Sequence, residues 1–162
     1  IGFPYLNITC DVDDNEVNKS CQYVQERFIR NGDRPPNDLT YVIPFQYYTY
    51  DEKQQVKEST IQFLTEKTGK LNYFDSIIKI NPNFNGFYFV NYPSEKWSKL
   101  INDLIANKDN VVSLLTVNDR SELITSSYFL SRAKLAPYFI ALDMHNYLVH
   151  ETHYVPWTFH SK

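Results

Sequence analysis

The stretch with the strongest potential for chemistry is His150-Glu151-Thr152-His153. Zinc metallopeptidases carry His-Glu-x-x-His on a helix, where imidazoles at i and i+4 bind the metal and the glutamate acts as general base. Here the histidines are at i and i+3, and no downstream glutamate has the spacing of a third ligand. We therefore predict a surface helix at this stretch, against the alternative of a self-contained hydrolase that uses His150 and His153.

A second polar cluster, Asn118-Asp119-Arg120, also resembles part of an active site. The residue types favour a helix start, in which Asn118 and Asp119 accept hydrogen bonds from free backbone N–H groups. We expect Arg120 to pair with a nearby carboxylate or carbonyl. The sequence contains no serine-centred nucleophile elbow and no glycine-rich phosphate loop. We predict no catalytic residue, no metal ligand and no cofactor in this chain.

The two cysteines, Cys10 and Cys21, flank a polar stretch rich in turn-forming residues between two strand-like runs. Strands paired around such a turn would bring the two side chains within disulfide reach. Two glycosylation sequons, at Asn7 and Asn18, lie in the same region. We predict a Cys10–Cys21 disulfide, glycosylation sites at both asparagines with their occupancy left open, and an oxidising secretory compartment.

Composition excludes some partners and indicates a fold class. The net charge is −3 and the basic residues are scattered, so we predict no nucleic-acid partner. Aromatic residues make up 16% of the chain, with 13 Tyr and 11 Phe, which favours β-rich packing over a tyrosine platform for carbohydrate or peptide. No apolar run approaches the roughly 20 residues that a transmembrane helix needs.

Up to Tyr92 the apolar residues alternate in short runs that turn-forming clusters separate. In the first run, Leu6 and Ile8 alternate with Asn7, which directs the first sequon outward. Pro44 lacks a backbone donor, so its strand should lie at an edge or carry a bulge. Six or seven such strands predict an antiparallel β-sandwich domain over residues 1–92.

The periodicity changes at Pro93, where we place the domain boundary. From here apolar residues recur at helical spacing, with Ser94 as an N-cap and further helices starting near Asn118, Pro137 and Glu151. The residues expected on the helical stripes are Trp97, Leu100, Ile101, Leu104, Ile105, Leu123, Ile124, Ser127, Tyr128, Ser131, Ile140, Met144, Tyr147 and Leu148. The predicted class is therefore α+β by segregation, with residues 93–162 forming the first helices of an α-helical C-terminal domain.

Two large apolar residues, Trp157 and Phe159, lie close to the end of the sequence. Each would lose roughly 1.5–3 kcal/mol by staying in water. We expect a truncated helical domain whose further helices would cover these side chains. Without those helices, the exposed apolar helix faces could form a dimer.

Short strings follow one another along the chain in a fixed order: Gln25-Glu26-Arg27-Phe28, Tyr41-Val42-Ile43-Pro44, Asn85 to Tyr92 with Trp97, Asn118-Asp119-Arg120, and Glu151-Thr152-x-Tyr154-Val155-Pro156-Trp157. Their order and spacing resemble one region of the aminopeptidase N-like zinc aminopeptidases, just after their catalytic domain. In that region a small β-sandwich leads into an all-helical domain. The chain departs from the family pattern at Tyr41, Phe89, Pro93 and Ser121, which indicates a divergent member.

The resemblance implies a non-catalytic structural fragment of a zinc aminopeptidase that removes N-terminal amino acids from peptides. The chain would brace the catalytic domain and help wall the substrate chamber. Its partners would be that catalytic domain, which would hold the zinc, and the rest of the helical domain, with peptide bound only through the whole protein. The implied location is extracellular or at the cell surface. The alternative is an extracellular interaction or adhesion module of a catalytically inactive relative.

Overall fold

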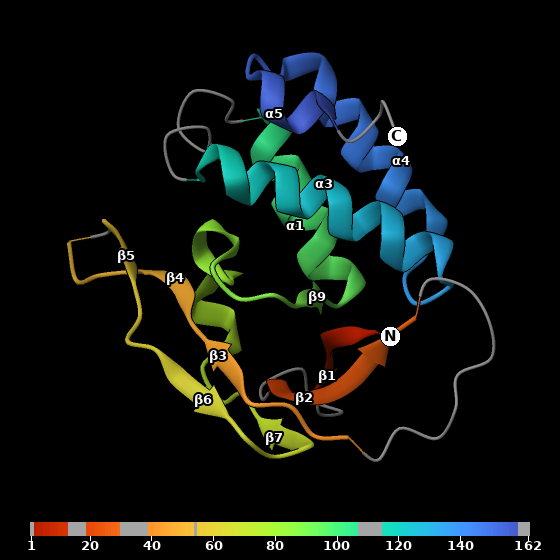
Figure 1. Ribbon diagram of the computed structural model, residues 1–162. Helices are drawn as coiled ribbons and strands as arrows, with labels where there is room; N and C mark the ends of the chain where they lie inside the picture. Colours follow the sequence, from red (N-terminus) through yellow and green to blue (C-terminus); the bar gives the residue numbers. More distant parts are fainter. Residues whose placement is uncertain (1, 13–18, 30–38, 54, 107–114, 159–162) are drawn as a thin grey trace. The chain divides into compact units, whose positions relative to one another are not determined.

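The structure is a computed structural model that describes residues 2–12, 19–29, 39–53, 55–106 and 115–158. It divides into two compact units, Ile1–Pro93 and Ser94–Lys162, which we call the strand unit and the helical unit. Figure 1 shows strands in the first unit and helices in the second. The predicted α+β class, with strands followed by helices, is confirmed.

The largest sheet of the strand unit has the order β7-β2-β1-β9. The long strands β1 (Phe3–Val12) and β2 (Lys19–Phe28) pair antiparallel, and β7 (Thr68–Lys70) pairs antiparallel with β2. The last strand, β9 (Phe89–Asn91), lies parallel to β1, with Tyr5 opposite Phe89. Among the described strands this is the one parallel pair, so the sheet is mixed where the sequence predicted antiparallel pairing throughout.

Two smaller sheets complete the strand unit. In one, β3 (Ile43–Phe45) pairs with β6 (Gln62–Leu64), which places Pro44 in a two-stranded sheet, as expected of a strand that lacks one donor. In the other, β4 (Tyr47–Tyr50) lies between β5 (Val56–Glu58) and β8 (Ile77–Ile80). Short 3-10 turns, η1 (Phe74–Ser76) and η2 (Pro82–Phe84), flank β8.

A buried glutamine connects separate parts of the strand unit. The Gln25 side chain of β2 donates to the carbonyls of Leu64 (3.2 Å) and Glu66 (3.0 Å). Its oxygen accepts a hydrogen bond from the backbone N–H of Tyr41 at 2.9 Å. Because Gln25 is fully buried, these bonds satisfy the donor and acceptor of its own side-chain amide, which water does not reach.

Aromatic side chains pack where β1, β2 and β9 lie side by side. The ring centroids of Phe3, Phe28 and Phe89 are 4.8–5.5 Å apart, in tilted or edge-to-face arrangements. Elsewhere in the unit Tyr47 stacks on Tyr73 at 5.5 Å. The abundance of aromatic residues is therefore used in part for packing between strands.

The loop between β8 and β9 contains three residues in the left-handed region: Asn81 (φ 63°), Asn83 (φ 57°) and Phe84 (φ 56°). Asn81 is buried, and its side chain bonds both backbone groups of Gly86. The Asn81 amide donates to Gly86 O, and its oxygen accepts from Gly86 N, each at 2.8 Å. This asparagine therefore holds the loop closed across five residues.

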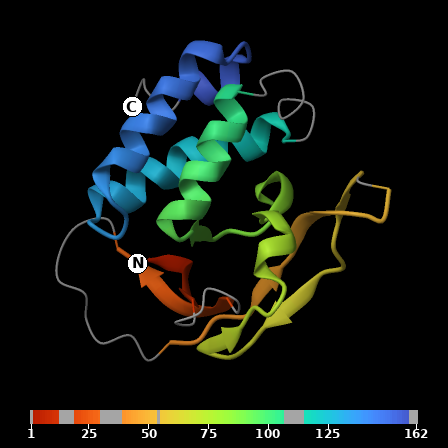
Figure 2. The same ribbon diagram turned by 180° about the vertical axis from the view of Figure 1, so that it is seen from behind.

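Within the residues that the structure describes, the helical unit contains α1 (Ser94–Ala106), α3 (Val117–Arg132), α4 (Tyr138–Tyr147), η3 (Leu148–His150) and α5 (Tyr154–Trp157). Helix α4 packs against α1 and α3, and α5 packs against α3 (Figures 1 and 2). None of these helices, within the described residues, is long and apolar enough to cross a membrane.

The predicted inward residues of the helices are mostly buried, but some predictions need correction. Ile105 is half-buried and Tyr128 is exposed, whereas the other twelve are buried. Helix α3 begins at Val117, so Asn118 is not its cap; the cap is Thr116. The last helix begins at Tyr154, and not at Glu151, because residues 151–153 are extended or irregular.

Candidate functional site: a buried arginine–glutamate pair

The helical unit contains a buried ion pair between Arg120 of α3 and Glu151, which follows η3. Arg120 Nε lies 2.7 Å from Glu151 Oε2, and Arg120 Nη2 lies 3.3 Å from Oε1. The two side chains are 2% and 1% exposed. The planar guanidinium thus binds both oxygens of a carboxylate that is removed from water.

Three further groups complete this network. Arg120 Nη1 donates to the carbonyl of Leu115 at 2.7 Å, and the Tyr147 hydroxyl donates to Glu151 Oε2 at 2.7 Å. The backbone N–H of His153 donates to Glu151 Oε1 at 2.8 Å. A buried ion pair is stable only when its remaining donors and acceptors find partners, and these three bonds supply them.

The electrostatics of the site favour the charged pair. Burial alone would raise the pKa of Glu151, but the hydrogen bonds from Arg120, the His153 N–H and Tyr147 outweigh it and lower that pKa. Burial likewise works against the charge of Arg120, yet Glu151 raises the pKa of the guanidinium. Burial and the bond to Glu151 raise the pKa of Tyr147. Since all three groups keep their protonation states at neutral pH, the site is suited to holding structure and not to proton transfer.

The local sequence places Arg120 through the start of α3. Thr116 Oγ1 accepts a bond from the Asp119 N–H at 3.2 Å, and Asp119 Oδ2 accepts from the Thr116 N–H at 2.9 Å. This capping box sets the first turn, and Arg120 follows directly. The indole N–H of Trp157 donates to the Glu151 carbonyl at 3.3 Å, which ties α5 to the same site. We call the ion pair with Tyr147 and Trp157 the clasp.

The structure joins the two polar stretches that the sequence singled out. Arg120 was expected to pair with a carboxylate or a carbonyl, and it pairs with one of each. The expectation of a surface helix around Glu151 is wrong, because this residue is buried and non-helical. Among the described residues no group of three or more His, Cys, Asp and Glu side chains could hold a metal ion.

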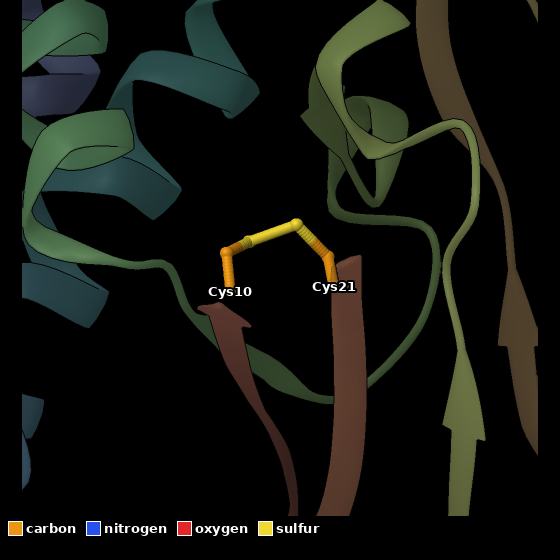
Figure 3. The surroundings of a disulfide bond; sticks show 2 residues. All are labelled: Cys10 and Cys21. Atoms are coloured by element: carbon orange, nitrogen blue, oxygen red, sulfur yellow. A yellow bond between two sulfur atoms is a disulfide. The ribbon is translucent and has the colours of Figure 1, made fainter. Parts of the chain in front are cut away.

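The structure contains the Cys10–Cys21 disulfide (Figure 3). The two residues lie directly opposite each other in the β1–β2 register, and their side chains point toward one another. Asn7 is half-buried in β1, and its side-chain oxygen accepts a bond from the Asn91 amide at 2.9 Å. Asn18 lies outside the described residues. Glycosylation at both positions stays a prediction.

Three polar side chains have roles that the sequence did not predict. Tyr147 was expected only as an apolar contact, although its place four residues before Glu151 is compatible with a bond to that carboxylate. Gln25 was expected to pair across strands, but its side chain bonds backbone groups of distant segments. Nothing in the sequence distinguished Asn81 from the other residues of its turn-rich cluster, so its bonds to Gly86 were not predicted.

Comparison with known proteins supplies the family. The ERAP1-like C-terminal domain family matches residues 77–160, about half of the chain. The chain belongs to this family. The match begins at β8, continues through the helical unit and includes both Arg120 and Glu151, so the clasp lies inside the family's own region.

Several aminopeptidases are similar to this family member over most of its length. Human glutamyl aminopeptidase is 32% identical over 97% of the chain, and mouse aminopeptidase N is 29% identical over 97%. Rat glutamyl aminopeptidase is 40% identical over 51% of the chain. The resemblance to aminopeptidase N-like proteins is thus confirmed. The chain covers 16% of the human protein and 15% of the mouse protein, so it corresponds to a limited portion of such enzymes.

Proposed function

We propose that this chain is a non-catalytic supporting portion of a zinc aminopeptidase, and that the clasp keeps its helical unit in the shape the enzyme needs. The observation that carries the proposal is the Arg120–Glu151 network. It joins Asn118-Asp119-Arg120 to the Glu151–Trp157 stretch in one fully paired, buried site. A site of this kind stabilises a fold and offers no reactive group to a substrate.

The zinc of such an enzyme would be held by its catalytic domain and not by this chain. The residues here do not fit the metal, because His150 and His153 are three residues apart and the glutamate between them already binds Arg120. The catalytic domain and the rest of the helical domain would be the partners. The peptide, from which N-terminal amino acids are released, would meet this chain only as a wall of the substrate chamber.

Exposed apolar side chains support contact with other protein surfaces. On the helical unit, Tyr138 is 63% exposed, Leu142 55%, Val149 80% and Tyr154 78%. Isolated exposed apolar residues are ordinary, but several on neighbouring turns mark an interaction surface. In the whole protein we expect neighbouring helices to cover them. In the isolated fragment the same residues could form a dimer.

The disulfide and the two sequons support an extracellular or cell-surface location. Disulfides persist in the secretory pathway and are rare in the cytosol. Treatment with a glycan-removing amidase should increase the gel mobility of the secreted protein. Asn7→Gln and Asn18→Gln would each remove part of that shift if both sites are occupied.

The test of the proposed function uses the whole protein that contains this chain. We expect it to release N-terminal residues from peptides, to lose that activity with a chelator, and to regain it with zinc. The test substrates are peptides with an N-terminal glutamate, which the name of one relative contains, and peptides with other N-terminal residues. Glu151→Ala should lower activity by reducing the amount of folded enzyme. Lys99→Ala, which changes an exposed ion pair, is the matched control.

Absence of peptidase activity in the folded, zinc-supplied whole protein would contradict the enzymatic part of the proposal. It would favour the second candidate, an extracellular interaction module of an inactive relative, which the exposed apolar residues of the helical unit also support. Stoichiometric zinc in the isolated chain, or peptidase activity of that chain alone, would contradict the supporting role itself.

A further inference from the structure

The loop between β8 and β9 contains a chemically labile dipeptide, Asn85-Gly86. In an Asn-Gly pair the glycine nitrogen can attack the side-chain amide carbon of the asparagine, because glycine has no side chain to obstruct the approach. Asn85 is exposed to solvent, which is the usual setting for this reaction. Glycine suits this position because a Cβ on Gly86 would overlap the buried ring of Tyr88.

The fold restrains the nucleophile of this reaction. The N–H of Gly86 donates to Asn81 Oδ1 at 2.8 Å, and Gly86 is buried although Asn85 is not. The Asn81 amide is itself anchored to Gly86 O at 2.8 Å and to Tyr88 O at 3.2 Å. To react, the Gly86 nitrogen must leave a buried hydrogen bond and lose its proton, and both steps require local opening of the loop.

The backbone of Asn85 adds a second restraint. Its φ and ψ are −69° and −28°, which is the right-handed helical region. Closure of the five-membered ring requires the Gly86 nitrogen and the Asn85 Cβ to be nearly eclipsed about the Cα–C bond. At the observed ψ they are far from eclipsed, so the nitrogen is turned away from the side-chain amide carbon.

We propose that Asn85 is a latent deamidation site which Asn81 keeps unreactive in the folded strand unit. On opening, the deprotonated Gly86 nitrogen forms a bond to Asn85 Cγ, and the side-chain nitrogen leaves as ammonia after taking up a proton. Water then opens the resulting succinimide at either carbonyl and leaves aspartate or isoaspartate at position 85. No oxidant or reductant takes part. The product carries one additional negative charge next to β9.

Two substitutions of Asn81 separate the role of its side chain from that of its backbone. Asn81→Gly tolerates the positive φ but removes the acceptor for Gly86 N–H. Asn81→Asp keeps an acceptor oxygen for the Gly86 N–H but loses the two bonds that the amide donates to Gly86 O and Tyr88 O. The folded whole chain and both variants are incubated at mildly alkaline pH, and deamidation in the peptide that contains Asn85 is followed by mass spectrometry. We expect Asn81→Gly to deamidate faster than the wild type, on the order of tenfold for loss of one buried hydrogen bond, and Asn81→Asp to stay closer to the wild type.

Two measurements keep the test decisive if a variant is destabilised. Amide hydrogen exchange of Gly86 in the wild type should be slow, since it reports the same opening that deamidation needs. In urea the wild-type chain provides the unprotected rate, with the second Asn-Gly pair of the sequence, Asn31-Gly32, as an internal reference in the denatured state. Equal Asn85 deamidation rates in folded and denatured wild type, or rapid exchange of the Gly86 amide, would overturn the proposal. So would an Asn81→Gly rate no higher than that of the wild type.

Discussion

Two kinds of buried polar site, one in each unit, can be compared. In the strand unit, Gln25 and Asn81 are neutral side chains that bond backbone groups of the surrounding segments. In the helical unit, Arg120 and Glu151 form a charged pair between side chains 31 residues apart. Irregular strands leave backbone donors and acceptors that a side-chain amide can satisfy. Helices satisfy their own backbone, so a polar link between helical segments has to be made by side chains.

This difference predicts where a substitution is most damaging. Removing one partner of the ion pair leaves an unpaired charge buried away from water. Removing a buried side-chain amide leaves neutral backbone groups without a hydrogen-bond partner, which costs less. Both tryptophans of the chain, Trp97 and Trp157, lie in the helical unit, so their fluorescence reports unfolding of that unit. Hydrogen exchange of strand amides reports the other unit.

Glu151→Ala should have the largest effect. It leaves the Arg120 guanidinium buried without its carboxylate, at an expected cost of about 3–5 kcal/mol in the free energy of unfolding. Urea unfolding followed by tryptophan fluorescence measures this loss. The double variant Arg120→Met with Glu151→Leu removes both charges and should recover part of the stability. If the single variant is as stable as the wild type, the clasp does not stabilise the helical unit.

Gln25→Leu should have a smaller but clear effect on the strand unit. It removes the partners of two carbonyls and one N–H while keeping the side-chain volume similar, for an expected loss of roughly 1–3 kcal/mol. Hydrogen exchange of amides in β2 and β6 should become faster. Gln22→Leu, at an exposed position of the same strand, is the control and should change little. If amide hydrogen exchange in Gln25→Leu is as slow as in the wild type, the buried amide does not stabilise the strand unit, and the comparison between the polar sites of the two units fails.

Acid should weaken the clasp over the pH range in which the Glu151 carboxylate becomes protonated. Its pKa is lowered in the folded state, so its contribution is complete above its unfolded pKa of about 4.3 and is lost as pH falls through the folded value. The stability difference between wild type and Glu151→Gln should therefore be constant near neutral pH and shrink below about pH 4. The effect is smaller than that of Glu151→Ala, because a glutamine can still bond Arg120. A difference that grows in acid would contradict the direction of the pKa shift.

Lys99→Ala should have the smallest effect. The Lys99–Asp103 pair on α1 spans 3.0 Å, but its side chains are 67% and 47% exposed. An exposed pair at i, i+4 contributes about 0.3–0.5 kcal/mol, and salt weakens it further. Tryptophan-monitored unfolding at low and high salt should show this difference. If Lys99→Ala lowered the free energy of unfolding as much as Glu151→Ala does, burial would not determine how strongly an ion pair stabilises this protein.

The features that the sequence predicted well are local ones. The order of strands followed by helices was predicted from the change in periodicity, and apolar spacing identified the buried residues Trp97, Leu100, Ile140 and Met144. The Cys10–Cys21 bridge spans a short hairpin, so proximity along the chain was sufficient to predict it. Periodicity is a property of neighbouring residues, and such properties are visible without a structure.

The features that the sequence did not predict depend on distant partners. Glu151 is a typical surface residue by type, and only the position of Arg120 explains why it is buried. The parallel place of β9 beside β1 could not be predicted, because alternation identifies a strand but not its neighbour. The Thr116 cap was missed because Asn118 and Asp119, which follow it, are also good capping residues.

The pairing of β1 with β9 also constrains how the protein is made. Asn7 and Asn91 are bonded across 84 residues, and β9 closes the edge of a sheet whose other members precede it in the chain. During translation the β1–β2 hairpin is synthesised before its parallel neighbour β9 leaves the ribosome. One edge of β1 therefore stays open to other chains until that point, and contacts of such long range form slowly. The hairpin's disulfide can form in this interval, before the sheet is complete.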